Sequence, residues 1–248
     1  MILISISSFI VFYFNGLGLA YNDARSHLDI GRRVVEGLKP GLAQLGSVWL
    51  PLPHILITLT VWNDFMWHSG LAGALVSMIS YVITGALIYK FLEKINVGML
   101  GRLIGVAVFA LNTNILYLQS TAMTESLLLV TMTAAVFELL LWYQDNKILN
   151  LVKAAFFIML STLVRYDGWF LFLFGFNYLK EKRKLIEASL FGIAALNLIQ
   201  YSMFGDPYRV GIVDFCKCLR IREARGRWCE TPLVGHKLSP LHRRLRTF

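Results

Sequence analysis

The chain has 248 residues, of which 56% are hydrophobic and only 16% carry a formal charge. A soluble domain has about 45–50% apolar and about 25% charged residues, so this composition excludes an ordinary soluble domain and indicates a polytopic membrane protein. The formal net charge is +9, and most of it lies in the basic stretch from Cys216 onward. That stretch lacks the regularly spaced aromatic residues of a single-strand binder, so no nucleic-acid partner is expected.

Residues 1–20 carry no charged side chain, and they are long enough to cross a bilayer as one helix. They lack the basic n-region of a signal peptide, which predicts an uncleaved first span. Residues 23–37 then predict a short amphipathic helix, followed by a turn over 37–46. A Pro-rich segment, Trp49-Leu-Pro-Leu-Pro-His54, leads into an apolar and aromatic stretch that ends at His68, and its aromatic residues suit the membrane interface.

Six further apolar runs follow, and the shorter ones are near or below the roughly 17-residue limit for an isolated span. They cover 71–91, 103–118, 126–142, 149–164, 169–179 and 185–204. The prediction is an all-α, polytopic transmembrane helical bundle of about seven spans, with amphipathic juxtamembrane helices in the first extracytoplasmic loop. Its domains are a transmembrane domain over 1–212 and a basic, Cys-containing tail over 213–248.

Basic residues predict the topology. They gather in alternate loops, around 90–102, 147–153 and 180–184. The positive-inside rule makes the side of these loops cytoplasmic, and with it the N-terminus. We therefore expect a multi-pass integral membrane protein, of the plasma membrane in a prokaryote or the ER membrane in a eukaryote, whose other ionisable turns face the opposite side.

Four motifs on that opposite side carry a family resemblance. They are Tyr21-Asn-Asp-Ala-Arg-Ser-His27, the Pro-rich Trp49–His54 segment, Thr121-Ala-Met-Thr-Glu125-Ser, and Arg165-Tyr-Asp-Gly-Trp169. In order and spacing they resemble the membrane-embedded GT-C glycosyltransferases, especially protein O-mannosyltransferases and the lipid A aminoarabinose transferase. The resemblance covers roughly 1–208. Because family enzymes are generally longer, it implies a C-terminally truncated chain, and a truncated or frameshifted reading frame would explain the unrelated tail.

The resemblance implies transfer of a mannose-like or related hexose, with inversion, from a polyprenyl-phosphate carrier to an acceptor hydroxyl on the extracytoplasmic or lumenal face. Such chemistry needs a base for the hydroxyl proton, for which Asp23 is the candidate. It also needs a cation for the donor phosphate, and the planar guanidinium groups of Arg25 and Arg165 suit phosphate oxygens. The alternatives are a helix N-cap for Asp23, headgroup snorkelling for Arg25, and a structural ion pair between Arg165 and Asp167.

The remaining candidates are acceptor-binding or supporting residues, namely His27, His54, Glu125 and Asp167. His27 lies four residues after Asp23 and shares its face if the segment is helical. The alternatives are a satisfied histidine in each imidazole's case and a first-turn acidic residue for Glu125.

No cluster has metal-ligand spacing, and no Gly-rich nucleotide loop occurs. We therefore expect no metal site and no cofactor, since the lipid-linked sugar is itself the donor substrate, although the spacing argument leaves a divalent metal open. The expected partners are the polyprenyl-phosphate-linked sugar, a glycan, lipid or protein acceptor, and membrane lipids.

Two rival functions remain open. A catalytically inactive truncated fragment or membrane scaffold is favoured by the tail, whose three cysteines fit neither a zinc nor a disulfide pattern. A transporter would show charges buried in the middle of spans and paired broken helices related by an internal repeat. The sequence has no such repeat and its ionisable residues lie at the ends of the spans, which disfavours transport.

Overall fold

The computed structural model describes residues 1–37, 40–45 and 49–171, all within a unit that spans Met1–Pro207. These ranges are helical and contain no strand, which confirms the all-α prediction. The elements are α1 (Ile2–Phe14), α2 (Asn22–Glu36), a 3-10 turn η1 (Leu42–Leu45), α3 (Pro51–Ile57), α4 (Asp64–Ser69), α5 (Leu71–Lys94), α6 (Met99–Ala110), α7 (Thr113–Gln119), α8 (Glu125–Asp145) and α9 (Ile148–Val164). Nearly all of the predicted run 169–179, the basic loop 180–184, the run 185–204 and the tail 213–248 lie outside the described residues.

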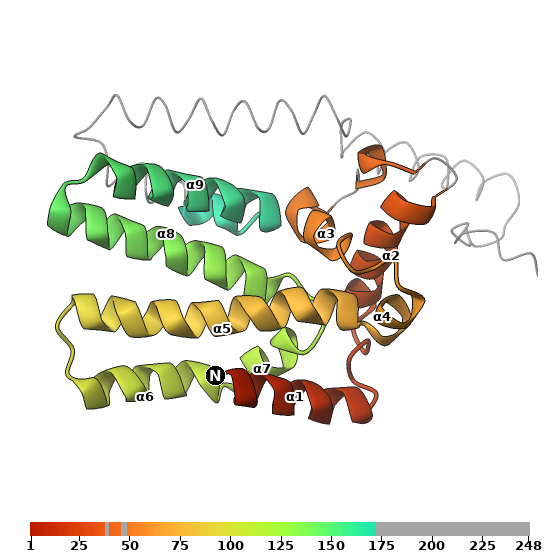
Figure 1. Ribbon diagram of the computed structural model, residues 1–248, viewed down its shortest axis with the longest axis horizontal. Helices are drawn as coiled ribbons and strands as arrows, with labels where there is room; N and C mark the ends of the chain where they lie inside the picture. The colour runs from red at the N-terminus through yellow and green to blue at the C-terminus, as the bar shows by residue number, and fades with distance from the viewer. Residues whose placement is uncertain (38–39, 46–48, 172–248) are drawn as a thin grey trace, which may run out of the picture. The chain divides into compact units, whose positions relative to one another are not determined.

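The long helices pack side by side. Helix α8 lies between α9 and α5, and α6 and α1 follow one another along the other side of α5 (Figure 1). Helices α2, α3 and α4 gather at the end where α5 and α8 begin (Figure 1). The connections between α5 and α6 and between α8 and α9 lie at the opposite end, which we call the connection end.

Two of the helices that the structure describes, α5 and α8, are long and apolar enough to cross a membrane. The pair α6 and α7 adds a third candidate if its two members form one span, although they are bent by 62°. Helices α1 and α9 are apolar but shorter. The predicted helices over 71–91, 126–142 and 149–164 are confirmed as α5, α8 and α9. Their ends could be predicted because charged or polar residues flank each apolar run. The described ranges therefore contain two or three candidate spans.

The prediction of one helix over residues 1–20 is wrong. Helix α1 covers 13 residues, about 20 Å at 1.5 Å per residue, which is shorter than the hydrocarbon core of a bilayer. It ends because the Asn15 side chain donates a hydrogen bond to the Val11 carbonyl at 2.7 Å and Gly16 takes a positive φ of +70°. At its other end the Met1 side chain lies against Gly85 in α5.

The predicted run over 103–118 is also interrupted. The side chain of Asn112 accepts hydrogen bonds from the backbone amides of Asn114 and Ile115, so it starts the new helix α7 inside the apolar run. The break leaves the Ala110 carbonyl outside a helical ladder. The hydroxyl of Tyr81 in α5 donates to that carbonyl at 2.8 Å, which satisfies a backbone group that would be costly in an apolar surrounding.

Small and hydroxyl-bearing residues form the contacts between the long helices. On α5 the buried set includes Gly73, Ser77 and Thr84, whereas the large Ile79 is 59% exposed. The Ser77 hydroxyl donates to the Met123 carbonyl at 2.9 Å. Small residues inside and large apolar residues outside are typical of helices that pack within lipid, and this pattern agrees with membrane association.

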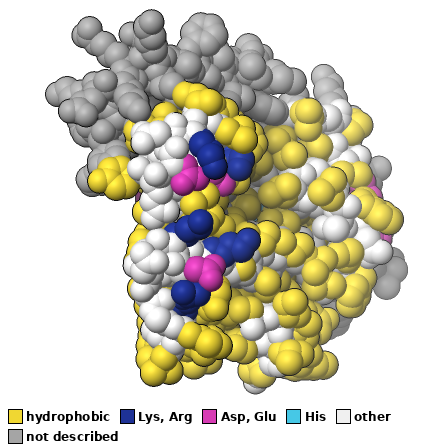
Figure 2. All heavy atoms as spheres, turned by 60° about the vertical axis from the view of Figure 1, so that its left-hand side comes forward, with side chains coloured by type: hydrophobic (Ala, Val, Ile, Leu, Met, Phe, Trp, Pro, Cys, Tyr) yellow, Lys and Arg dark blue, Asp and Glu magenta, His cyan; other side chains and the backbone are white. Residues whose placement is uncertain are grey.

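Charged side chains gather at the connection end amid a mostly hydrophobic surface, as Figure 2 shows. The ion pairs there join Arg102 to Glu93 at 2.7 Å and Lys147 to Asp145 at 3.3 Å. The predicted basic loops 90–102 and 147–153 therefore lie at one end of the bundle, with α2 to α4 at the other. Which end faces the cytoplasm stays a prediction.

Candidate functional site

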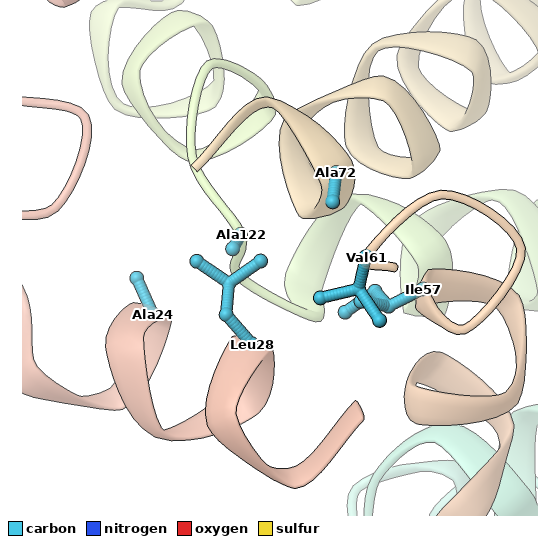
Figure 3. Packing of buried hydrophobic residues seen from close by; sticks show 6 residues of the cluster. All are labelled: Ala24, Leu28, Ile57, Val61, Ala72 and Ala122. Carbon is cyan, nitrogen blue, oxygen red and sulfur yellow. The ribbon is translucent and has the colours of Figure 1, made fainter. Parts of the chain in front are cut away.

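A hydrophobic cluster joins α2 and α3 to the end of the bundle. Its members come from α2, from α3 and the turn after it, from the start of α5 and from the turn before α8 (Figure 3). On α2 they recur one turn apart, which makes one face of this helix its packing face. The cluster residues are Ala24, Leu28, Ile57, Val61, Ala72 and Ala122. This packing places α2 against α3, and with it the histidines that each helix carries.

His27 of α2 and His54 of α3 form a buried pair. The His27 Nδ1 and His54 Nε2 atoms are 2.9 Å apart and share a hydrogen bond, and both side chains are almost completely inaccessible to solvent. The Trp49 ring packs edge-on against His27 with 4.6 Å between the ring centroids. The alternative of a satisfied histidine at the surface is wrong about the location, because both rings are buried.

Burial makes this pair neutral. Desolvation lowers the pKa of His27 from 6.5 to about 4, while the nearby Asp23 charge opposes the shift and the Arg165 charge adds to it. Desolvation also lowers the pKa of His54 to about 3, with further lowering by His27 and Arg33 against a raising effect of the Leu50 backbone. A shared hydrogen bond between two neutral imidazoles has one proton, so one ring donates and the other accepts.

Asp23 lies one turn before His27 in the first turn of α2, and its side chain is exposed. The negative charge in this position complements the positive end of the helix dipole. The helix begins after Tyr21 and no side chain caps its start, so the N-cap interpretation of Asp23 is wrong. Asp23 and His27 are four residues apart in the same helix, as the predicted shared face requires, but the Asp23 side chain is exposed while that of His27 is buried.

Arg165 is held by two carboxylates just after α9 ends. Its Nη1 donates to Glu125 at 2.8 Å and its Nε donates to Asp167 at 2.9 Å. Thr124 Oγ1 lies 3.4 Å from the same Nη1. The structural ion pair with Asp167 is thus present, but the guanidinium also spans from α9 to the start of α8. Helix α3 contacts both α2 and α9. The residues Asp23, His27, His54, Glu125, Arg165 and Asp167 therefore lie at the same end of the bundle (Figure 1).

Glu125 sits in the first turn of α8 as predicted, with one carboxylate oxygen on Arg165. Its other oxygen, Oε2, is buried and has no hydrogen-bond partner within the described ranges, and the same holds for the hydroxyl of the neighbouring Ser126. The other ring nitrogen of His54, Nδ1, is also buried, and the Leu50 backbone acts on this imidazole. Unsatisfied buried polar atoms are uncommon in folded proteins, and two of them, from Glu125 and Ser126, occur at this end of the bundle.

Arg25 is the predicted site residue that the structure does not bring to this group. Two residues after Asp23, it points to another side of α2 because a helix turns by about 100° per residue. Its guanidinium pairs with Asp29 at 3.3 Å and lies 4.6 Å over the Trp67 ring. These contacts do not place Arg25 beside Arg165, and headgroup snorkelling by its partly exposed side chain stays a prediction.

Sequence reasoning missed three residues that shape this region. Arg32 of α2 binds the backbone after α3, Arg33 acts electrostatically on His54, and Trp49 covers His27. The spacing of Arg32 and Glu36 by four residues signals their ion pair. The other contacts join segments that only tertiary packing brings together.

No protein-family model, no curated protein and no solved structure matches this chain. The glycosyltransferase resemblance therefore stays a prediction from the motifs. Within the described ranges, no three His, Cys, Asp or Glu residues lie close enough to hold a metal ion. The three cysteines are outside those ranges.

Proposed function

We propose that the chain is a multi-pass membrane glycosyltransferase of the GT-C type, with about seven spans and its connection end in the cytoplasm. It would move a mannose-like or related hexose from a polyprenyl-phosphate carrier to an acceptor hydroxyl on the extracytoplasmic or lumenal side. One observation carries this proposal. An exposed carboxylate, a neutral imidazole pair and an arginine between carboxylates share the end of a membrane-type bundle opposite its basic loops.

In this reaction Asp23 takes the proton of the acceptor hydroxyl as the hydroxyl oxygen bonds to the anomeric carbon. The bond between that carbon and the phosphate oxygen breaks, and its electron pair leaves with the polyprenyl phosphate. Attack from the face opposite the phosphate inverts the anomeric carbon. Asp23 is exposed and therefore accessible to an acceptor.

Arg165 is the cation for the leaving phosphate. A guanidinium binds phosphate oxygens through charge-assisted hydrogen bonds, and a phosphate here competes with Glu125 and Asp167 for the same donors. The neutral His27 and His54 place no positive charge beside Asp23, so they leave its carboxylate free to accept a proton. Arg25 remains the second candidate for the phosphate, and like Arg165 it would have to exchange its present contacts, which are with Asp29 and Trp67, for the ligand.

The test is sugar transfer by membranes that contain the protein, with a panel of radiolabelled polyprenyl-phosphate sugars as donors. We expect Asp23→Asn to lower transfer by about 10²–10⁴-fold, the usual contribution of a general base. The matched control is Asp145→Asn, which removes an ion-paired carboxylate at the connection end and should retain transfer. Full activity of Asp23→Asn would remove Asp23 as the base. Absence of transfer from every donor would favour the fragment or scaffold.

A further inference from the structure

Glu125 carries a carboxylate oxygen that the proposed reaction does not use. Its Oε1 accepts a hydrogen bond from Arg165 Nη1 at 2.8 Å. Its Oε2 is buried and has no hydrogen-bond partner among the residues that the structure describes. The carboxylate is therefore satisfied through only one of its two oxygens. A buried polar atom without a partner costs free energy, so its presence in a fold calls for an explanation.

Structural roles account for the first oxygen but not for the second. Glu125 begins α8, where its negative charge complements the positive end of the helix dipole. It also pairs with Arg165, but Asp167 already supplies that guanidinium with a carboxylate at 2.9 Å. Neither role needs Oε2 to be buried without a partner. A ligand that donates a hydrogen bond to this oxygen would satisfy it.

The position of Glu125 determines which group of a ligand can reach it. Arg165 is the proposed cation for the phosphate of the polyprenyl-phosphate hexose, and Glu125 is bonded to that same guanidinium. The Arg165 and Glu125 side chains are 32% and 27% exposed, so a ligand can approach the pair from solvent even though Oε2 is covered. The torsion about the last bond of a glutamate side chain is broad and two-fold, so a rotation can exchange the two oxygens.

The chemistry of an ionised carboxylate narrows the choice further. It can only accept hydrogen bonds, so its partner must carry an O–H or N–H group. The phosphate that joins the hexose to its carrier is a diester and has no such group. The hydroxyl on carbon 2 of the hexose is the one closest to the phosphate, because carbon 2 adjoins the anomeric carbon. A hydroxyl that donates to a carboxylate forms a charge-assisted hydrogen bond, which is stronger than a neutral one.

From these contacts we infer that Glu125 binds the hydroxyl on carbon 2 of the carrier-linked hexose and selects against sugars that lack it. The inference rests on the proposed function, in which the phosphate competes for the Arg165 nitrogen that now holds Glu125. As the phosphate takes that nitrogen, the carboxylate exchanges the guanidinium for the sugar hydroxyl and keeps a partner. A 2-deoxy hexose leaves the carboxylate without one, and sites built to bind a hydroxyl reject analogues that lack it.

Two sugar donors and three variants test the assignment. The donors are the polyprenyl-phosphate hexose that gives the most transfer, mannose in the first instance, and its 2-deoxy analogue. For each donor kcat/KM is measured with the full chain in membranes. Glu125→Gln keeps the shape of the side chain but places an amide NH2 where one oxygen stands, and Glu125→Ala removes both oxygens. The matched control is Glu138→Gln in the same helix, because its Oε2 is also buried and lacks a partner within the described ranges.

We expect the ratio of the two kcat/KM values, hexose over 2-deoxy hexose, to fall in both Glu125 variants by about 10–100-fold, the size of a hydrogen bond to a charged group. The ratio should stay unchanged in Glu138→Gln. Each ratio compares two donors on one protein sample, so a variant that is partly unfolded still reports it. The difference in intrinsic reactivity between the donors cancels when variants are compared.

The outcomes separate this inference from the proposed function. Transfer with the same ratio in the parent chain and in both Glu125 variants would overturn the inference and leave the proposed function standing. An equal fall of the ratio in Glu138→Gln would overturn it as well, because the effect would then not belong to Glu125. Absence of transfer by the parent chain from every donor would overturn both.

Discussion

Replacing Arg32 of α2 should destabilise the protein far more than replacing Arg25 of the same helix. Arg32→Ala removes two charge-assisted hydrogen bonds to the Val61 and Trp62 carbonyls, and bonds to charged groups contribute about 1.5–3 kcal/mol each. Its carboxylate partners Asp64 and Glu36 are 74% and 53% exposed, so these ion pairs add only about 0–1 kcal/mol each. Water can reach part of the released turn, and we expect a loss of about 2–4 kcal/mol in the free energy of unfolding.

The control is Arg25→Ala, which removes a half-exposed ion pair with Asp29 and a stacking contact with Trp67. These contacts are worth about 1 kcal/mol together. Denaturant unfolding in detergent, followed by circular dichroism, measures both variants against the parent chain. Arg32→Lys separates charge from shape, because an ammonium cannot bind partners on several sides as a planar guanidinium does, and it should recover less than half of the loss. Equal destabilisation by the two alanine variants would refute the reasoning.

The histidine pair predicts a pH dependence. Burial lowers the pKa to about 4 for His27 and about 3 for His54, against 6.5 in the unfolded chain. Below about pH 6.5 the unfolded state therefore binds more protons than the folded state. Stability is therefore complete above that pH and is lost as the pH falls toward 4, by up to about 1.4 kcal/mol per unit for each imidazole. Unfolding of His27→Gln across this range should give a shallower slope, and an unchanged slope would contradict the assignment. A separate expectation concerns Gly73, where an added Cβ would collide with Ala122. Gly73→Ala should lower the unfolding temperature, at a cost of about 1–3 kcal/mol, whereas Gly98→Ala, with open space around it, should not.

The long helices could be predicted from the sequence because apolar runs with charged or polar ends determine them. Helix α5, for example, begins after Gly70 and ends at the charged residue Lys94. The break between α6 and α7 had a local signal, since Asn112 in an apolar run is a good helix N-cap. The run 103–118 nevertheless predicts one helix, because its three polar residues, Asn112, Thr113 and Asn114, are few beside its apolar ones. The early end of α1 had the same kind of signal in Asn15 and Gly16.

The candidate site was predictable in its members but not in its contacts. Asp23 and His27 share a face for reasons of helical spacing alone. The partner of His27, however, is His54 of another helix, and the packing of α2 on α3 decides it. Arg25 is close to Asp23 in sequence, which suggested a role in the same site. Its position on the helix instead directs its side chain to Asp29 and Trp67.

Gln119 of α7 connects two distant parts of the chain. It is fully buried, accepts a hydrogen bond from the Ser5 hydroxyl at 2.6 Å and donates to the Ser5 carbonyl, across a separation of 114 residues. A ribosome that adds about 5–20 residues per second needs roughly 6–23 seconds to synthesise that interval. During biosynthesis, α1 is therefore made well before α7, and Ser5 cannot form these hydrogen bonds until Gln119 has been synthesised.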